Sequence, residues 1–234
     1  ALQNMTLTVD LELPEAEMLK TVRAGRRLLA PLLAARNGST APLMSCFGHS
    51  HIDLAWLWPL EETIRKCART FGSQLALMEE YPDFKFLQSQ PHAYMLVKQH
   101  FPEMYERIKQ AVKRGQWIPD GALWVEPDTN ISSGESLIRQ VLYGKRFFKE
   151  EFGVDSKLMW LPDVFGYSGA LPQIMKGCGI DCFSTQKIFC VAGNDGVMFP
   201  YNLFVWEGID GSKITSYIHN DYSSAMNPTA VMAR

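Results

Sequence analysis

The chain has 234 residues, a formal net charge of −2, and 47% hydrophobic residues, ample for a packed core. This length accommodates one large domain, or one medium domain with an appendage. Because no long run of one charge sign occurs and no stretch reaches the roughly 20 apolar residues of a membrane span, we expect neither nucleic acid nor a membrane as a partner.

The first 40 residues predict the end of a preceding region followed by a linker helix. Residues 6–13 alternate apolar and polar side chains, which predicts a strand. The segment from Pro14 to about Arg36 is rich in Leu, Ala and Arg and predicts a helix, which ends at Asn37-Gly38-Ser39. We therefore place the main domain in residues 41–234, and we expect it to be incomplete at its C-terminus.

From Leu43 onward, short apolar runs alternate with segments of helical spacing. The runs predict strands at residues 43–47, 84–87, 117–118, 158–161 and 182–184. The segments between them predict helices at residues 60–78, 104–115, 132–148 and 172–178. A hairpin is predicted from residues 203–206 and 214–218, joined by a turn at residues 208–211.

This alternation of strands and helices predicts an α/β fold with a mostly parallel sheet covered by helices. In sheets of this kind, active sites lie at the carboxyl ends of the strands. Residues that directly follow the predicted strands are therefore the candidates for a functional site.

The most informative of these segments is Gly48-His49-Ser50-His51-Ile52-Asp53. His51 and Asp53 are two residues apart, so in extended backbone their side chains point to the same side. An imidazole and a carboxylate that converge in this way are suitable ligands for zinc or a similar divalent ion. His49 lies on the same side, and we expect it to orient His51. The alternative is a hydrogen-bonded polar turn without a ligand.

A second carboxylate, Asp163, directly follows the predicted strand 158–161. Pro162 restricts the residue before it and Gly166 permits a tight turn, so Asp163 is expected to be held firmly at the same end of the sheet as His51. The alternative is that Asp163 caps the next helix.

A third segment, Trp124-Val125-Glu126-Pro127-Asp128, has two acids after an aromatic residue. Sugars present apolar faces and hydroxyl groups, so aromatic rings beside carboxylates are suited to bind them. An ordinary loop with its acids in water is an equally good interpretation of this segment by itself.

Together these segments resemble glycoside hydrolase family 38, the class II α-mannosidases, and most closely the cytosolic and vacuolar type with its bacterial relatives. The resemblance extends from about Phe47 to Tyr217, and three runs carry it in the same order: GHSHIDLAW at residues 48–56, WVEPDTNISSGESL at residues 124–137, and WLPDVFGYS at residues 160–168. Several long motifs in one order are far more specific than any one of them.

The resemblance implies an irregular seven-stranded β/α barrel, truncated here, of the glycoside hydrolase and deacetylase type. It implies a retaining exo-α-mannosidase that hydrolyses terminal α-linked mannose of oligosaccharides, with Zn²⁺ (or Co²⁺) bound to the sugar hydroxyls. The implied metal ligands are His51, Asp53 and Asp163, with Asp163 also the nucleophile. The residues implied to bind substrate are Trp56, Asp128, Phe165 and Lys187.

The fourth metal ligand and the general acid of the family are expected beyond Arg234, since the surroundings of His219 do not match the fourth-ligand motif. Two rival functions remain open. A metal-dependent carbohydrate deacetylase would use a similar His/Asp-ligated metal to activate water, and an inactive carbohydrate-binding fragment would not turn over at all.

The five cysteines are scattered and odd in number, which does not indicate a disulfide framework. We expect small buried side chains in a reducing compartment. No signal peptide is recognised, so the expected location is cytoplasmic, with the vacuole as the alternative. A homo-oligomer is an open expectation for the full-length enzyme.

Overall fold

A computed structural model gives the structure of the chain, and it describes residues 1–35, 45–189, 200–219 and 229. The chain divides into two compact units, residues 1–45 and residues 46–234. Within the described ranges, no helix combines the length and the apolar character that crossing a membrane requires.

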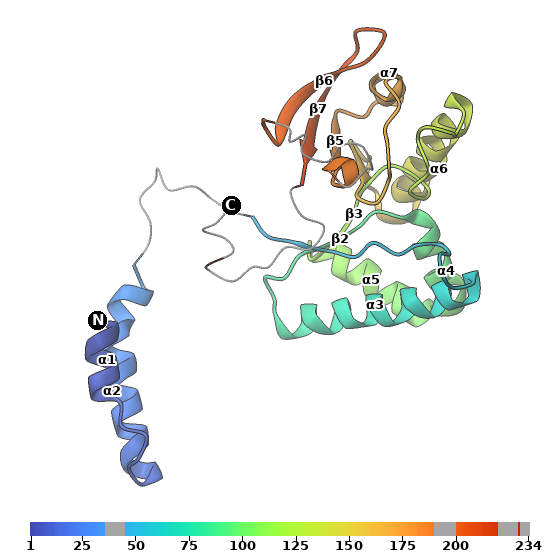
Figure 1. The fold of residues 1–234 in the computed structure, drawn as a ribbon. Helices are drawn as coiled ribbons and strands as arrows, with labels where there is room; N and C mark the ends of the chain where they lie inside the picture. The colour runs from blue at the N-terminus through green and yellow to red at the C-terminus, as the bar shows by residue number, and fades with distance from the viewer. Residues whose placement is uncertain (36–44, 190–199, 220–228, 230–234) are drawn as a thin grey trace. The chain divides into compact units, whose positions relative to one another are not determined.

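The first unit is a pair of helices, α1 (Leu2–Thr8) and α2 (Glu15–Leu33) (Figure 1). The strand predicted at residues 6–13 is therefore wrong. Gly25 is the buried residue of α2, and a methyl group there would lie 2.7 Å from Val9 Cγ2 and 3.1 Å from Met5 Cγ. Because Gly25 has no side chain, Met5 and Val9, which are one helical turn apart, both pack closely against α2. This packing favours a helix more strongly than the short alternating pattern favours a strand. The helix predicted from Pro14 to about Arg36 is confirmed as α2, and its role as a linker stays a prediction.

The second unit begins with a parallel sheet of three short strands in the order β1 (Gly48–His49), β2 (Phe86–Gln88) and β3 (Trp117–Pro119). Helices connect the strands: α3 (Leu60–Glu80), α4 (Pro91–His100) and α5 (Pro102–Lys113). In Figure 1, α3 and α5 run beneath the strands of this sheet. Helix α4 was not predicted, and β1 begins after the predicted strand 43–47, of which residues 43–44 lie outside the described ranges.

A second sheet has the strand order β4 (Leu158–Leu161), β5 (Cys182–Thr185), β7 (Lys213–Ile218) and β6 (Leu203–Glu207). Strands β4, β5 and β7 are parallel, and β6 and β7 form the predicted antiparallel hairpin. Helix α6 (Gly134–Phe152) precedes β4, and α7 (Leu171–Gly177) connects β4 to β5. A short 3₁₀ helix, Lys187–Phe189, follows β5.

The α/β class and the mostly parallel strands are confirmed. A closed seven-stranded barrel is not what the described ranges show, because their strands form two separate sheets. The sheets meet where the N–H of Trp160 in β4 donates to the carbonyl of Gly121, just after β3, at 3.3 Å. This contact brings the carboxyl ends of β3 and β4 together.

Two apolar clusters hold these elements in place. The first joins α3, α4 and α5 around the buried side chains of Tyr94 and Trp117. Trp117 Nε1 donates to Tyr94 Oη at 2.7 Å, and Tyr94 Oη donates to the carbonyl of Gln88 at 3.0 Å. The second cluster joins β4, β5 and α7 around Met159, Leu161 and other apolar side chains. Packed side chains therefore anchor the strands whose ends carry the candidate site.

The expectation that the cysteines are small buried side chains is confirmed only in part. Cys46, Cys67, Cys178 and Cys182 are all free thiols, and Cys190 lies outside the described residues. Cys67 is buried, as expected, but Cys46 and Cys182 are exposed. The expectation of buried cysteines is therefore wrong at these two positions.

Candidate metal centre

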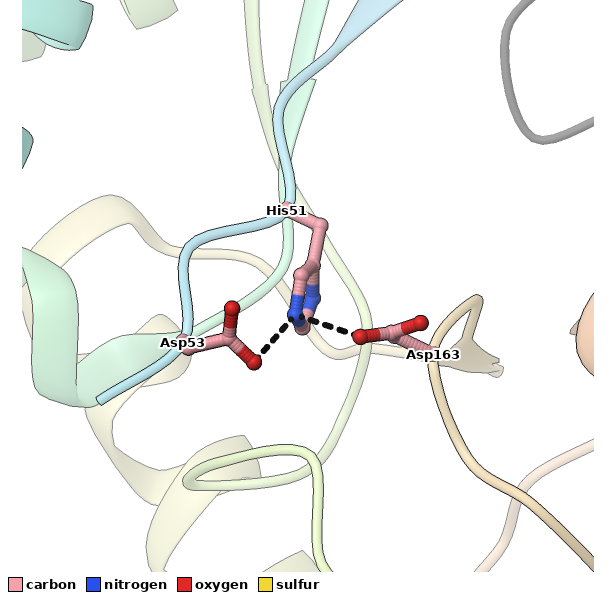
Figure 2. A group of neighbouring side chains, drawn as sticks. All are labelled: His51, Asp53 and Asp163. Atoms are coloured by element: carbon pink, nitrogen blue, oxygen red, sulfur yellow. Dashed lines mark hydrogen bonds and ion pairs between the residues drawn. The ribbon is translucent and has the colours of Figure 1, made fainter. Parts of the chain in front are cut away.

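Three predicted ligands from two distant parts of the chain lie together in the structure. His51 and Asp53 follow β1, and Asp163 follows β4 (Figure 2). His51 Nε2 lies 3.1 Å from Asp53 Oδ1 and 3.1 Å from Asp163 Oδ2. One ligand atom from each residue lies within 4.8 Å of the other two. Asp163 does not cap α7, because the residue at that position is Ala170.

The backbone that carries His51 and Asp53 is held by buried polar groups. Gln88 Nε2 donates to the carbonyl of Ser50 at 3.2 Å. On the other side, Thr63 Oγ1 donates to the carbonyl of Leu54 at 2.6 Å. The segment between β1 and α3 is therefore fixed on both sides of the candidate ligands.

A single nitrogen, His51 Nε2, faces two carboxylates, and this arrangement suits a cation. An Nε2–H group can donate fully to only one oxygen, so the two aspartates are imperfectly satisfied by a proton alone. Burial lowers the pKa of His51, but the hydrogen bonds and charges of Glu126, Asp53 and Asp163 outweigh burial and raise the pKa to about 9. A metal that binds here must displace that proton. One imidazole nitrogen and two carboxylate oxygens match the ligand types of zinc.

Glu126 also contacts the centre, and this contribution was not foreseen from the sequence. Its Oε1 accepts from His51 Nδ1 at 2.8 Å and from Gln90 Nε2 at 3.2 Å. Its Oε2 accepts from the backbone N–H of Asp163 at 3.2 Å. The sequence interpretation gave the substrate role to Asp128, whereas Glu126 is the acid whose side chain enters the centre.

His49 does not have the orienting role expected of it, which the structure gives to Glu126. The His49 ring accepts from Trp160 Nε1 at 3.1 Å and lies 3.5 Å from Ser89 Oγ. Burial, and then the charges of His51 and His219, lower the pKa of His49 to about 3. His49 is thus a neutral, buried link between β1 and β4.

Two of the expected substrate residues lie beside Asp163. Lys187 Nζ is 2.8 Å from Asp163 Oδ1, and it also lies 5.2 Å from the centre of the Phe165 ring. Phe165 is 58% exposed, so much of its side chain is accessible to a ligand. An ammonium group, a carboxylate and an exposed ring are therefore adjacent.

The other two expected substrate residues have different surroundings. Trp56 is exposed and packs edge-on against Trp58, with ring centres 5.6 Å apart. The Asp128 carboxylate accepts from the backbone N–H groups of Asn130 and Ile131 at 2.8 and 2.9 Å. These bonds give Asp128 a structural role in its turn, and the substrate roles of Trp56 and Asp128 stay predictions.

Among the described residues, the ligand group has only its three members. His219 is not a member of the group; it bonds to Ser184 Oγ at 2.9 Å, and its ring lies 5.2 Å from that of Trp160. The placement of a fourth ligand and of the general acid beyond Arg234 stays a prediction.

Comparison with known proteins identifies relatives of this chain. The model of the glycosyl hydrolases family 38 N-terminal domain matches residues 42–233. α-Mannosidase G of Dictyostelium discoideum is 53% identical over 170 residues, which are 73% of this chain and 15% of the relative. Human α-mannosidase 2C1 is 45% identical over 195 residues, covering 83% of this chain and 18% of the relative.

Among solved structures, an α-mannosidase from Enterococcus faecalis V583 superimposes with a TM-score of 0.68 at 28% identity. The match covers 80% of this chain and 22% of that structure. The chain thus spans less than a fifth of the two curated relatives named above.

Proposed function

This chain belongs to glycosyl hydrolase family 38, and from that premise we propose that it supplies the metal- and nucleophile-bearing part of a retaining exo-α-mannosidase. The proposed substrates are glycans with terminal α-linked mannose, and residues 41–234 are the proposed catalytic domain. The observation that carries the proposal is the convergence of His51, Asp53 and Asp163 at the ends of β1 and β4. Relatives named as α-mannosidases support the substrate class.

His51, Asp53 and Asp163 are the proposed ligands of Zn²⁺, with Co²⁺ as a substitute. When bound, zinc supplies a Lewis acid that can bind hydroxyl oxygens of the sugar and orient its ring. The residues of the chain position the metal ligands and the nucleophile. His51 presents Nε2 towards the two aspartates, because Glu126 is hydrogen-bonded to the other ring nitrogen, Nδ1.

Asp163 is the proposed nucleophile. In a retaining mechanism, a carboxylate oxygen forms a bond to the anomeric carbon while the bond from that carbon to the leaving oxygen breaks. A general acid gives the departing alcohol its proton, and the same group then deprotonates the water that releases the sugar. Lys187 contacts one oxygen of Asp163 and holds the carboxylate in one orientation. The exposed ring of Phe165 offers a surface for the apolar face of the sugar.

A carbohydrate deacetylase is the rival enzyme, and substrate choice separates the two. The full-length protein, loaded with zinc, should cleave an aryl α-mannoside and leave an acetylated sugar intact. Release of acetate without mannoside cleavage would favour the deacetylase, and zinc binding without either reaction would favour the carbohydrate-binding alternative.

His51→Ala tests the metal site in the same protein. The variant should lose zinc and mannosidase activity together, because it removes the nitrogen that faces both aspartates. His100→Ala, at an exposed position at the end of α4, is the matched control and should keep both. Stoichiometric zinc and normal turnover in His51→Ala would refute the assignment. The cytoplasmic location and the homo-oligomer stay predictions.

A further inference from the structure

Glu126 contacts two parts of the centre that come from different strands. One carboxylate oxygen meets the ring of His51, which follows β1, and the other meets the backbone N–H of Asp163, which follows β4. The Glu126 side chain is only 5% exposed, so water has little access to these contacts. A single buried carboxylate therefore joins a candidate ligand to the backbone of the candidate nucleophile.

We propose that Glu126 is a positioning residue that sets the tautomer of His51 and the backbone position of Asp163 at the same time. This inference rests on the proposed function, since it assumes that His51 binds the metal through Nε2. A carboxylate at Nδ1 keeps the proton on that nitrogen and leaves the Nε2 lone pair free for a metal.

The number of hydrogen-bond donors around Glu126 explains why a carboxylate is needed. Three N–H groups point at its two oxygens, from His51 Nδ1, Gln90 Nε2 and the Asp163 backbone. An ionised carboxylate only accepts, so both of its oxygens suit these donors. A glutamine at position 126 has one oxygen and one NH₂ group, and the NH₂ group has to face a donor in either orientation.

Each orientation of a glutamine would disturb a different part of the centre. With the oxygen towards His51, the NH₂ group meets the Asp163 N–H, and that backbone segment loses its acceptor. With the oxygen towards Asp163, the NH₂ group meets His51 Nδ1, which must then accept and give the proton to Nε2. The second orientation places a hydrogen where the metal would bind.

Two buried glutamines, Gln88 at the end of β2 and Gln90 directly before α4, show that this geometry is built into the fold. Gln88 and Gln90 are both buried, at 1% and 3% exposure. Gln88 Oε1 accepts from the backbone N–H of Gln90 at 3.2 Å, and Gln90 Nε2 donates to Glu126. Because Gln88 also donates to the Ser50 carbonyl, the β2 end positions both Glu126 and the His51 segment.

The test compares Glu126→Gln with Glu151→Gln in the full-length protein. Glu151 is a matched control, since its side chain is 17% exposed and hydrogen-bonded to Tyr105, away from the centre. Zinc affinity is measured by competition with a chromophoric chelator, and the His51 ring nitrogens are followed by NMR of ¹⁵N-histidine-labelled protein. Loss of a residue that orients a metal ligand typically weakens metal binding by about 10–100-fold.

We expect Glu126→Gln to weaken zinc binding by about 10–100-fold, to shift the ring nitrogens of His51, and to speed hydrogen exchange at the Asp163 amide. Glu151→Gln should change none of these. Wild-type zinc affinity, ring signals and amide exchange in a folded Glu126→Gln protein would overturn the proposal.

A wild-type measurement keeps the inference testable even if Glu126→Gln does not fold. The zinc-loaded wild-type chain should show His51 protonated at Nδ1, and a proton on Nε2 with zinc bound would overturn the proposal. If the wild-type chain binds no zinc, the proposed function fails by itself. The ring signals and the Asp163 amide exchange of the metal-free variants then still decide the role of Glu126.

Discussion

Replacing Gly144 with alanine should destabilise the unit of residues 46–234 and loosen the candidate centre. Gly144 is a buried residue within α6, and a methyl group there would lie 2.1 Å from the carbonyl oxygen of Ala122. The neighbouring backbone must therefore shift. That backbone leads directly to Glu126, and α6 also holds it through Gln140, whose carbonyl accepts from the Trp124 N–H at 3.0 Å.

The magnitude follows from two opposing effects. Adding a methyl group to a tightly packed site costs about 1–3 kcal/mol, while alanine gains about 1 kcal/mol over glycine in a helix interior. Because the methyl group would meet backbone atoms and not a flexible side chain, the cost lies in the upper part of that range, about 2–3 kcal/mol, and the expected net loss for Gly144→Ala is then about 1–2 kcal/mol. Gly72→Ala is the matched control in α3, because its methyl group would meet only Met104 Cε, at an ordinary 3.5 Å. That variant should gain up to about 1 kcal/mol.

Urea unfolding followed by tryptophan fluorescence measures both variants. The six tryptophans all lie between residues 56 and 206, so the signal reports on the second unit alone. The urea midpoint should fall for Gly144→Ala and rise for Gly72→Ala. Equal shifts of one sign, or a Gly144→Ala protein more stable than wild type, would refute the packing argument.

Three further predictions concern stability and reactivity. Tyr94→Phe removes the acceptor of the buried Trp117 Nε1–H group, so the free energy of unfolding should fall by about 1–3 kcal/mol in urea titrations; an unchanged midpoint would contradict this. Burial raises the pKa of Glu151, but hydrogen bonds from its lysine and tyrosine neighbours outweigh burial and lower this pKa. The ionised side chain therefore stabilises the fold above the ordinary glutamate pKa of 4.5, and this stabilisation is lost as pH falls through the lower pKa of the folded state. Glu151→Gln should therefore make stability less sensitive to acid below about pH 4.5, and identical acid unfolding curves would refute this. Burial raises the pKa of the Cys67 thiol to about 12. At pH 8 a thiol reagent should therefore modify the exposed Cys46 before it modifies Cys67, as measured by peptide mass mapping. Early labelling of Cys67 would contradict its burial.

The three candidate ligands could be predicted because each lies just after a strand that the sequence places in or directly after an apolar run, β4 within residues 158–161 and β1 directly after residues 43–47. In a parallel sheet, the carboxyl ends of the strands lie on one side, so the sequence alone leads us to expect that His51, Asp53 and Asp163 meet there. The structure brings them together, although they come from strands of two different sheets. Local patterns were sufficient here because the strand ends alone place these residues.

The contribution of Glu126 could not be predicted in the same way. Its partner His51 is 75 residues away, and its contact with Asp163 is to a backbone N–H, which every non-proline residue carries. Only the three-dimensional path of residues 121–126 decides which acid of the segment points inward. That path depends on Ala122, whose φ of 66° is rare for a residue with a side chain.

The missed helix α4 and the mistaken N-terminal strand have a related cause. Only two residues separate the end of β2 at Gln88 from Pro91, the first residue of α4. This helix packs against α3, α5 and α6, so the spacing of its apolar residues shows no one-sided pattern. In the N-terminal unit, the packing of Val9 at Gly25 is a contact between residues 16 positions apart. The spacing of apolar residues within a short stretch of sequence therefore cannot predict helix α4 or the contact between Val9 and Gly25.

The labelling of Asp163 by a slow fluorinated mannosyl substrate tests the central claim most directly. The trap accumulates the covalent sugar ester on the nucleophile of a retaining enzyme, and peptide mass mapping locates it. In the zinc-loaded full-length protein, we expect one sugar on the peptide that contains Asp163 and none after Asp163→Asn. A sugar on Asp128 or on another acid, with Asp163 unmodified, would contradict the account.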